Sequence, residues 1–494
     1  MALLGLDLGT SGVKAAVFDA AGRVLGYAYE EYPLYLPHAG WIELDSDQCW
    51  AATQRVIAAA VAAAGSRVQA MSISCHGEAV TPVAADGRAL ARSIVTFDNR
   101  TVEQAAWWAE HYGAARFYQV TGHALHPMGT IHKIMWWREH QPEVFAAARW
   151  FLCYEDLVWY RLGLSPAMGT SLAARTMAFD LHAGDWSDEL LGLAGIERSR
   201  LARAVPAGTV VGVVSAPELG LDGVLAVAGG HDQAVCALGG GAIKPGQAVN
   251  TIGTAEVVTP CLGSAVLSPE LQRANLACYP HSAPGRYVAL GIVAFSSGAL
   301  VKWYKDQLGL AERLEAERQA RNVYEVMIES ASDGPSPVLV LPHFSGTGTP
   351  ALDPLATGAF VGLTLGTTRA DIIKGIYDSL AYEMKQNLDV LTRAGVPVTE
   401  VRALGGGSRS DRALQLKADI LGIPIAAADV PEAGCLGAAI LAGTAAGVYG
   451  SVEEGVAATV RTRAEFTPRA GETARYAERY GQYLQLYGRL KGAV

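Results

Sequence analysis

The chain has 494 residues, of which 50% are hydrophobic and 18% are charged. This length exceeds what one hydrophobic core supports, so we expect at least two domains, and the composition excludes a disordered chain. The net charge of −9 offers no basic surface, so we expect no nucleic-acid partner. The N-terminal residues MALLGLDLGT lack the basic region of a secretory signal.

An uncharged segment, residues 433–452, has to be weighed as a membrane span. Its many glycines and alanines make it only weakly hydrophobic, which predicts a buried, closely packed helix and no membrane association. The seven cysteines are scattered and form no CxxC pair. Such a set is typical of buried thiols in a reducing cytosol, so we expect a cytoplasmic protein without a zinc site.

Strands and helices are expected to alternate along the chain, as in layered α/β domains. Apolar runs separated by glycine-containing turns predict an antiparallel three-stranded meander at the N-terminus, followed by a helix and a strand. These five elements are expected over residues 3–8, 13–19, 23–29, 47–64 and 68–74.

The second half of the chain partly repeats this organisation. The breaker cluster Lys244-Pro245-Gly246 separates the halves, so we expect domains over 1–246 and 247–494. Near the C-terminus, tyrosines at positions 476, 480, 483 and 487 follow helical spacing, which predicts a packing face, with a homodimer interface as the alternative. The second half is predicted to hold strands over 247–252, 338–341 and 401–404, a helix over 371–391 and a helix from Asp411.

An N-terminal turn offers a phosphate-binding site. Phosphate oxygens need backbone N–H donors in a concave turn, which Gly9-Thr10-Ser11-Gly12 can supply, and the hydroxyl groups of Thr10 and Ser11 can add hydrogen bonds. Lys14 can add positive charge, and Asp7 is placed to hold a hydrated Mg²⁺. The alternative is an ordinary hairpin whose aspartate caps the turn. No Gly-Lys pair occurs in the sequence, so a Walker-type loop is absent.

Asp232 lies in the glycine-rich segment Gly229-Gly230-His231-Asp232-Gln233, after an apolar run. A lone carboxylate there can accept the proton of a substrate hydroxyl as a general base. A phosphate-binding turn and such a base together indicate phosphoryl transfer to an alcohol. The alternative is that Asp232 caps a helix that starts near Gln233, and both roles can coexist.

Polar side chains that follow strands commonly face a ligand cleft in α/β folds. His76 and Glu78 follow one predicted strand, and Asp98-Asn99-Arg100 follows another apolar segment. These groups suit a polyhydroxylated substrate, whereas the alternative is loop capping and a surface Asp98–Arg100 pair. Three further histidines lack the spacing of a metal site: His123, His126 and His132.

Five segments, in their order along the chain, carry a resemblance to a known family. They are GLDLGTSGVKAAVFD near the N-terminus, MGTIHKIMWWREH at 128–140, GGHDQ at 229–233, GAFVGLTLGTTRADIIKGIYDSLAYE at 358–383, and GGGSRSDRALQLKADILGIPI from 405. On these motifs the chain resembles the FGGY carbohydrate kinases over nearly its whole length. The resemblance implies two related actin-like, ribonuclease H-like α/β domains that flank a catalytic cleft and close on the sugar.

The resemblance also implies roles for the domains and for single residues. It assigns sugar and phosphate binding to the first domain, nucleotide binding to the second, and ATP with Mg²⁺ as cofactors. Asp232 becomes the catalytic base, and Asp7 and Asp232 the carboxylates on the metal side. The nucleotide would contact Thr10, Ser11, Lys14, Gly253, Thr254, Gly405, Gly406 and Ser410. The substrate would contact His76, Gly77, Glu78, Arg100, Asp232 and Gln233.

The first hypothesis for the substrate is D-xylulose, phosphorylated at a terminal hydroxyl, because Cys75-His76-Gly77 is similar to a xylulokinase motif. Glu78 and Asp232-Gln233 look more like glycerol kinases, and Asp98-Asn99-Arg100 more like gluconate kinases. Gluconate, glycerol, erythritol and other ketoses or polyols therefore stay open. A carboxylate at position 78 that faces the substrate would disfavour a sugar acid. A non-catalytic sensor of ATP and sugar is the alternative of another class, which the presence of Asp232 disfavours.

Overall fold

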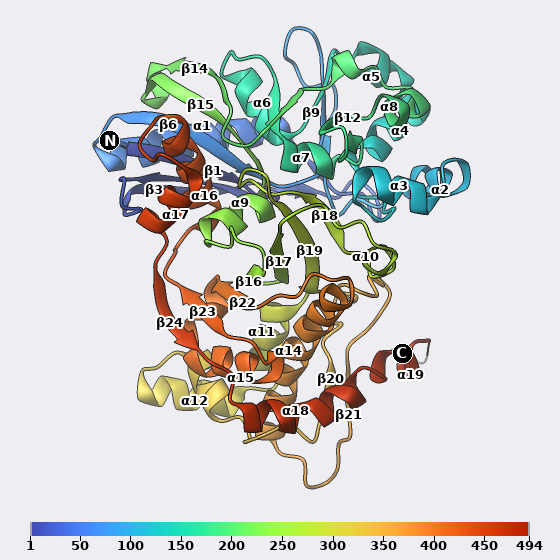
Figure 1. Cartoon of the computed structure of the whole chain (residues 1–494), viewed down its shortest axis with the longest axis vertical. Coiled ribbons are helices and arrows are strands. Elements are labelled where there is room, and N and C mark those ends of the chain that lie inside the picture. Colours follow the sequence, from blue (N-terminus) through green and yellow to red (C-terminus); the bar gives the residue numbers. More distant parts are fainter. Residues whose placement is uncertain (1, 493–494) are drawn as a thin grey trace.

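The computed structural model describes residues 2–492, which form two lobes that lie one above the other in Figure 1. Each lobe is built around one mixed β-sheet with helices packed against it. The strand order is β14-β15-β6-β1-β2-β3 in the first sheet and β18-β19-β17-β16-β22-β23-β24 in the second sheet.

The first sheet starts with the meander that the sequence predicts. β1, β2 and β3 pair antiparallel, and β6 and β15 add in parallel on the other side of β1. β1 is buried along nearly its whole length, as its continuous apolar run requires of a central strand covered on both faces. The strands of this sheet are β1 (Ala2–Leu8), β2 (Gly12–Phe18), β3 (Val24–Glu31), β6 (Val68–Cys75), β14 (Val210–Ala216) and β15 (Leu221–His231).

The second sheet repeats this arrangement. β16, β17 and β19 pair antiparallel, and β22 and β23 add in parallel on the other side of β16. A meander followed by two parallel strands is thus common to both sheets, which confirms the predicted pair of related α/β domains. The strands are β16 (Gln247–Ile252), β17 (Glu256–Leu262), β18 (Ala277–Pro280), β19 (Tyr287–Ala294), β22 (Glu400–Leu404), β23 (Ile425–Ala428) and β24 (Thr462–Phe466).

Capping residues set the ends of the main helices. α1 (Ser46–Ala64) begins after Asp45, whose side chain accepts two backbone N–H groups of the first turn. The sequence predicts a helix that starts at Asp371. The observed helix α14 (Arg369–Arg393) starts earlier, at Arg369, because Thr368 and Asp371 form a capping box. The helices that position the site are α4 (Thr130–His140), α6 (Tyr154–Arg161), α7 (Thr170–Arg175), α9 (Asp232–Gly239), α11 (Ser297–Gln307) and α15 (Asp411–Leu421).

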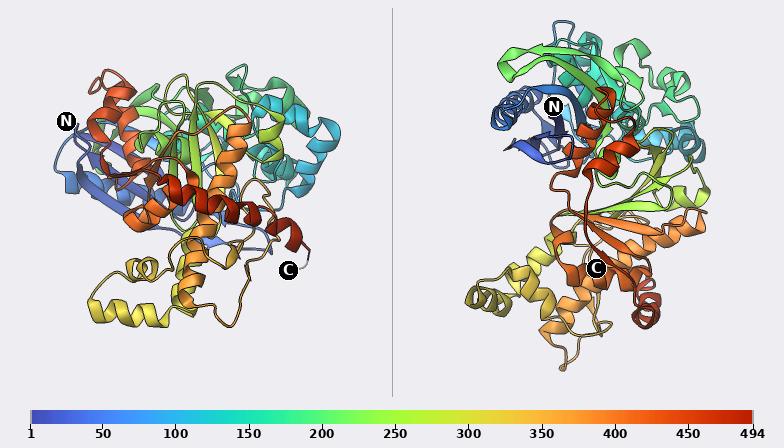
Figure 2. Two further views of the ribbon diagram at one scale, coloured as in Figure 1. Left: turned by 60° about the horizontal axis from the view of Figure 1, so that its bottom comes forward. Right: turned by 60° about the vertical axis from the view of Figure 1, so that its left-hand side comes forward.

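α16 (Ala433–Ala445) is the uncharged segment near the C-terminus, and it packs against β1, β6 and α9 of the first lobe. Figure 2 shows this red helix beside the blue N-terminal strands. Glycine allows the close approach, because a Cβ on Gly437 would lie 2.1 Å from the carbonyl oxygen of Val235. The prediction of a buried, closely packed helix is confirmed. Within residues 2–492, none of the helices combines the length and the apolar character of a membrane span.

Three of the four tyrosines of the C-terminal stripe lie on α18 (Ala470–Tyr483), which packs against α14 and α15, and the fourth, Tyr487, lies on α19 (Leu486–Leu490). Tyr476 and Tyr480 are buried, and their hydroxyl groups bond to Lys374 and Asp389 of α14 at 2.8 and 2.7 Å. The predicted packing face is therefore confirmed, and the homodimer alternative stays a prediction.

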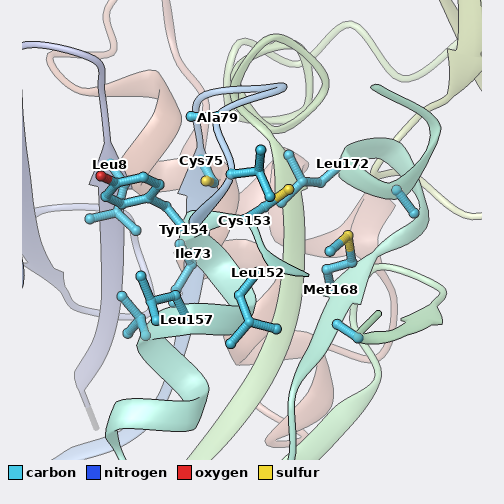
Figure 3. Packing of buried hydrophobic residues seen from close by; sticks show 14 of the residues in the cluster. Leu8, Ile73, Cys75, Ala79, Leu152, Cys153, Tyr154, Leu157, Met168 and Leu172 are labelled. Carbon is cyan, nitrogen blue, oxygen red and sulfur yellow. The ribbon is translucent and has the colours of Figure 1, made fainter. Parts of the chain in front are cut away.

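A buried core supports the strand ends from which the site is built. Figure 3 shows Leu8 at the end of β1 and Ile73 and Cys75 on β6 beside Tyr154 and Leu157 of α6. All five side chains are buried. Burial of each large apolar side chain stabilises the fold by about 1.5–3 kcal/mol. The packing of this core therefore keeps the ends of β1 and β6 together. The polar residues that follow these strands therefore start from a rigid base.

Candidate active site

The turn between β1 and β2 is stabilised by a hydrogen bond within the turn and by two hydrogen bonds from Tyr32. Gly9 N–H donates to the carbonyl oxygen of Gly12 at 2.9 Å. The hydroxyl of Tyr32 donates to the Gly12 carbonyl at 3.2 Å, and its backbone N–H donates to the Ser11 carbonyl at 3.2 Å. Thr10 and Ser11 lie at the accessible tip of this turn. Their predicted contact with phosphate fits this position, and Tyr32 is a supporting residue that the motif did not reveal.

Asp7 lies near the end of β1, where its Oδ1 accepts a hydrogen bond from Ser74 Oγ at 2.6 Å. Burial raises its pKa above the ordinary value. A Cβ on Gly434 would lie 2.9 Å from the carboxylate carbon of Asp7, so the first turn of α16 reaches this side chain. Lys14 is paired with Glu432 at 2.8 Å. Its contact with phosphate stays a prediction that requires this partly exposed ion pair to open.

Glu78 follows β6 in a strained backbone conformation, with a φ of 63°. Its carbonyl oxygen accepts hydrogen bonds from Thr130 Oγ1 at 3.0 Å and from Lys133 Nζ at 2.9 Å. Burial lowers the pKa of Lys133 to about 8. Lys133 belongs to the first signature motif of the resemblance, so the structure gives that lysine a role in holding Glu78.

The Glu78 carboxylate is neutralised by partners that are distant in sequence. It forms a buried ion pair with Arg175 of α7, and its second oxygen accepts a hydrogen bond from Thr96 Oγ1 at 3.0 Å. The expectation that Glu78 repels a sugar acid therefore loses its basis, because the charge is paired with a cation. Sequence reasoning missed Arg175, since nothing in its local sequence marks it as a partner.

Asp232 is the first residue of α9, and His231 occupies the cap position without a side-chain cap. The alternative role of Asp232 as a helix cap is therefore not observed. Burial, and then the charges of Asp7 and Glu78, raise the pKa of Asp232 to about 7. Its side chain is 32% exposed, while its Oδ1 is buried and makes no aligned hydrogen bond with the described residues. His231 Nε2 lies 3.2 Å from this oxygen, so the exposed part of the carboxylate is the part that a substrate hydroxyl can reach.

Further acceptor atoms lie on the residues around Asp232. His76 Nδ1 is 2.8 Å from the carbonyl oxygen of Leu8, so it carries the proton and leaves Nε2 with a lone pair. Burial lowers the pKa of His76 to about 4, which keeps the ring neutral. Within residues 2–492, His76 Nε2 and Gln233 Oε1 are buried without a partner. We call His76, Glu78, Asp232 and Gln233 the acceptor pocket.

The other two predicted substrate residues play different parts. Arg100 is buried in ion pairs with Asp98 and Glu43 at 2.7 and 2.9 Å, and its guanidinium lies over the Trp41 ring. The alternative Asp98–Arg100 pair is thus present, but it is buried rather than on the surface. These contacts occupy the Arg100 guanidinium, so its predicted contact with the substrate stays a prediction. Gly77 makes room for a neighbour, since a Cβ there would lie 2.9 Å from the His231 ring.

A cavity of about 540 Å³ lies in the second lobe, between the β16–β17 turn and the helices α11 and α15. The predicted nucleotide residues Gly253, Thr254, Gly406 and Ser410 line it. Gly405 is not among the lining residues. Its φ of 84° and a Cβ distance of 2.6 Å to the Ile252 carbonyl show that it shapes the turn. Sequence reasoning missed other lining residues, among them Asn322, Tyr324, Glu325, Tyr377 and Arg409.

A buried ion pair joins the walls of this nucleotide cavity. Lys417 of α15 is paired with Glu256 at the start of β17, and it also donates to Asn250 of β16 at 3.2 Å. The second oxygen of Glu256 accepts a hydrogen bond from Ser297 at the start of α11, at 2.8 Å. Both charges are thereby satisfied inside the protein, and four elements, α11, α15, β16 and β17, are fixed relative to one another.

The residues present fit a nucleotide with Mg²⁺. Asp7 and Asp232 are close enough for the charge of Asp7 to raise the Asp232 pKa. Among residues 2–492, no three His, Cys, Asp or Glu side chains gather as a metal site. Mg²⁺ in nucleotide sites takes one or two carboxylates and completes its shell with phosphate oxygens and water, so this donor set fits it.

Comparisons with known proteins agree with this geometry. Models of the FGGY family of carbohydrate kinases match at residues 2–239 for the N-terminal domain and 248–446 for the C-terminal domain. The chain belongs to the FGGY family of carbohydrate kinases. A glycerol kinase from Bordetella parapertussis is 35% identical over 472 residues, which cover 92% of this chain and 90% of that protein. The chain is thus a phosphotransferase with an alcohol acceptor that uses ATP with Mg²⁺.

Two solved structures place the fold within this FGGY group. A xyloylose kinase from Brucella ovis superposes with a TM-score of 0.89 at 29% identity, and both chains are covered in full. A Plasmodium falciparum glycerol kinase with ADP has a TM-score of 0.87 at 19% identity, covering 98% of each chain, and supports the fold alone. Because family membership makes the chain an enzyme, the non-catalytic sensor is set aside.

Proposed function

We propose that this FGGY kinase phosphorylates a terminal hydroxyl of a small polyol or open-chain sugar, with glycerol as the first candidate. The observation that carries the proposal is Asp232 at the start of α9, whose pKa is raised to about 7 and whose side chain is 32% exposed. Its neighbour Gln233 and the strand-end residue His76 each carry a buried acceptor atom without a partner among residues 2–492. Acceptor atoms without partners suit a substrate that presents several hydroxyl donors. The name of the Bordetella relative favours glycerol over D-xylulose, the first hypothesis from the sequence.

In this proposal the chain's residues bind, orient and deprotonate the alcohol. Bound Mg-ATP supplies the phosphoryl group that is transferred. Asp232 accepts the proton of the attacking hydroxyl as that oxygen bonds to phosphorus and the terminal bridging P–O bond breaks. His76 Nε2 and Gln233 Oε1 accept hydrogen bonds from the other hydroxyl groups. The turns at Thr10-Ser11 and Gly253-Thr254 hold the phosphate oxygens.

D-Xylulose is the second candidate. It rests on the full-length similarity to the Brucella ovis xyloylose kinase at 29% identity. Gluconate stays in the comparison, because the Glu78–Arg175 pair removes the repulsion that would exclude a sugar acid. The roles of the single residues, the 246/247 domain boundary and the cytoplasmic location stay predictions.

An ADP-release assay with Mg-ATP tests the substrate. Glycerol, erythritol, D-xylulose, D-ribulose and gluconate would be compared at equal concentrations, with kcat/KM measured for each active compound. We expect glycerol to give the highest kcat/KM. A higher value for D-xylulose would replace glycerol with the second candidate. No stimulation by any of the five, with ATP binding intact, would contradict the proposed substrate class.

A further inference from the structure

Two carboxylates line the nucleotide cavity, Glu256 and Glu325, and the protein neutralises only one of them. Glu256 is paired with Lys417, and its second oxygen accepts a hydrogen bond from Ser297 at 2.8 Å. Glu325 is partly buried and forms no ion pair within residues 2–492. Its one hydrogen bond in that range is the long contact from Ser410 Oγ at 3.4 Å. The cavity therefore presents a negatively charged acceptor that the protein leaves available to a ligand.

The short helix α13 (Val323–Glu329) holds Glu325 at the cavity wall. The side chain of Asn322 caps this helix by accepting the backbone N–H of Tyr324 at 2.9 Å. The helix packs against α14 and α15, and its buried side chains are Val326, Met327 and Ile328. The carboxylate is thus presented by a packed element rather than by a loose loop.

Two hydroxyl groups from other elements share this part of the wall. Ser410 stands directly before α15 and donates the long contact to Glu325. Tyr377 of α14 also lines the cavity, and burial, followed by the charge of Glu325, raises the pKa of its hydroxyl. A carboxylate has about four acceptor positions on its two oxygens. Acceptor positions of Glu325 therefore remain for a donor on a bound ligand.

The charge of Glu325 decides which part of a nucleotide can lie against it. The triphosphate is negatively charged, so its contact with a carboxylate would be repulsive. Its predicted position at Gly253-Thr254 is on a different element, the turn between β16 and β17. A nucleoside, in contrast, carries hydrogen-bond donors, namely the amino group of adenine and the two hydroxyl groups of ribose. Apolar side chains that suit a flat base line the same cavity, among them Val301, Leu380 and Leu416.

We propose that Glu325 is a specificity-determining residue that accepts a hydrogen bond from a donor of the bound nucleoside, either the amino group of adenine or a ribose hydroxyl. This inference rests on the proposed binding of Mg-ATP in this cavity. A hydrogen bond to a charged acceptor is stronger than one between neutral groups, and a nucleotide without the donor leaves the carboxylate without its partner. Glu325 thus selects the phosphoryl donor through its nucleoside.

Glu325→Ala tests the inference with ATP and three analogues that each lack one donor: purine riboside triphosphate, 2′-deoxy-ATP and 3′-deoxy-ATP. Calorimetry gives the Kd of each. We expect the variant to raise the Kd for ATP about ten-fold, but to raise the Kd for the analogue that lacks the partner group by about two-fold or less. A small loss with purine riboside triphosphate identifies the amino group, and a small loss with a deoxy analogue identifies a ribose hydroxyl. Glu325→Gln keeps an oxygen acceptor, so its loss with ATP should be smaller.

Glu329→Gln is the matched control, because Glu329 lies one turn further along α13, pairs with Arg321 at 2.6 Å and does not line the cavity. It should leave the Kd for ATP unchanged. In Glu325→Ala, kcat at saturating ATP should also stay unchanged, because the contact is to the nucleoside. An equal loss of affinity for ATP and all three analogues, or no loss for ATP, would overturn the inference.

Gly406→Leu separates the inference from the placement of the nucleotide. Gly406 lines the cavity, and a Cβ there would have no neighbouring atom within 4 Å, so the protein can accommodate a larger side chain that takes up space for the ligand. We expect ATP affinity to fall about ten-fold or more. Unchanged affinity would overturn the placement and the inference together. If Gly406→Leu weakens binding and Glu325→Ala does not discriminate among the analogues, only the inference fails. These measurements need no alcohol, so they do not depend on the proposed substrate.

Discussion

The two sides of the cleft handle charge in different ways. In the acceptor pocket and at Lys133 beside it, titratable side chains lie close together, and the pKa values of Asp232, His76 and Lys133 are shifted in the direction that favours each neutral form. In the nucleotide cavity, glycine-containing turns form much of the wall, and the main buried charges, Glu256 and Lys417, are paired with each other. Both sides contain a buried ion pair, since Glu78 is paired with Arg175 in the acceptor pocket, but only the acceptor pocket also holds a carboxylate whose pKa is raised to about 7. Such a shifted pKa is typical of a site where a proton is transferred, which supports our proposal for the acceptor pocket.

The largest effect is expected from breaking the charge balance of the acceptor pocket. Arg175→Met leaves the Glu78 carboxylate buried and unpaired, which should lower the free energy of unfolding by about 3–5 kcal/mol and abolish most activity. Denaturant unfolding measures the first effect and ADP release the second. The matched control is the double variant Glu78→Gln/Arg175→Met, which should recover part of the stability. Equal stability of the single and double variants would contradict a buried pair.

The second effect concerns pH. Asp232 has to be ionised to accept a proton, and its pKa is raised to about 7, so kcat/KM for the alcohol should rise with pH through that value. Below it, the rate should fall about ten-fold per pH unit. ATP affinity, measured over the same range, serves as the control and should change little. A midpoint near pH 4 would show that the carboxylate titrates as in water.

A smaller effect is expected when the ion pair of the nucleotide cavity is broken. The double variant Glu256→Gln/Lys417→Met removes the ionic contact that ties α15 to β17 without leaving an unpaired buried charge, so the KM for ATP should rise about five-fold, as expected for about 1 kcal/mol. The KM for the alcohol should stay unchanged. Steady-state kinetics with each substrate varied in turn measures both values. Equal increases in both KM values would show that this ion pair affects the binding of the alcohol as well as the binding of ATP.

The smallest effect is expected at Ser410, which lines the nucleotide cavity. Its hydroxyl lies 3.4 Å from Glu325 Oε2, a long and therefore weak hydrogen bond. Ser410→Ala should raise the KM for ATP by roughly two- to three-fold without a change in kcat. Thr392→Ala on α14 is a suitable control, since that hydroxyl bonds to a backbone carbonyl within its own helix. A loss of kcat in Ser410→Ala would assign this residue a part in the chemistry.

Local sequence patterns were sufficient to predict those elements that are stabilised by local interactions. The N-terminal meander, the turn at Thr10 and Ser11 and the strands before His76 and Gly405 follow from glycine positions and apolar runs. The nucleotide residues Gly253, Thr254, Gly406 and Ser410 required the family resemblance, and four of the eight predicted contacts line the cavity.

The remaining features depend on partners far apart in the chain. Arg175 is 97 residues from Glu78, and Lys417 is 161 residues from Glu256. The hydroxyl of Tyr279, on β18 of the second sheet, lies 2.9 Å from Nδ1 of His231, at the end of β15 of the first sheet. No local pattern encodes such pairs, because they exist only after both sheets have formed. The packing of α16 against the first lobe could not be predicted for the same reason. Its uncharged sequence predicts that the helix is buried, but it does not indicate which surface covers it.

The most direct test of the account compares Asp232→Asn with the unmodified enzyme. ATP binding, measured by calorimetry, and polyol-dependent ADP release would be determined for both. The account predicts ATP binding within about two-fold of the unmodified enzyme, because Asp232 does not line the nucleotide cavity, and a loss of turnover of about 10²–10⁴-fold. Turnover that persists at the unmodified rate would show that another group accepts the proton and would contradict the division of the cleft proposed here.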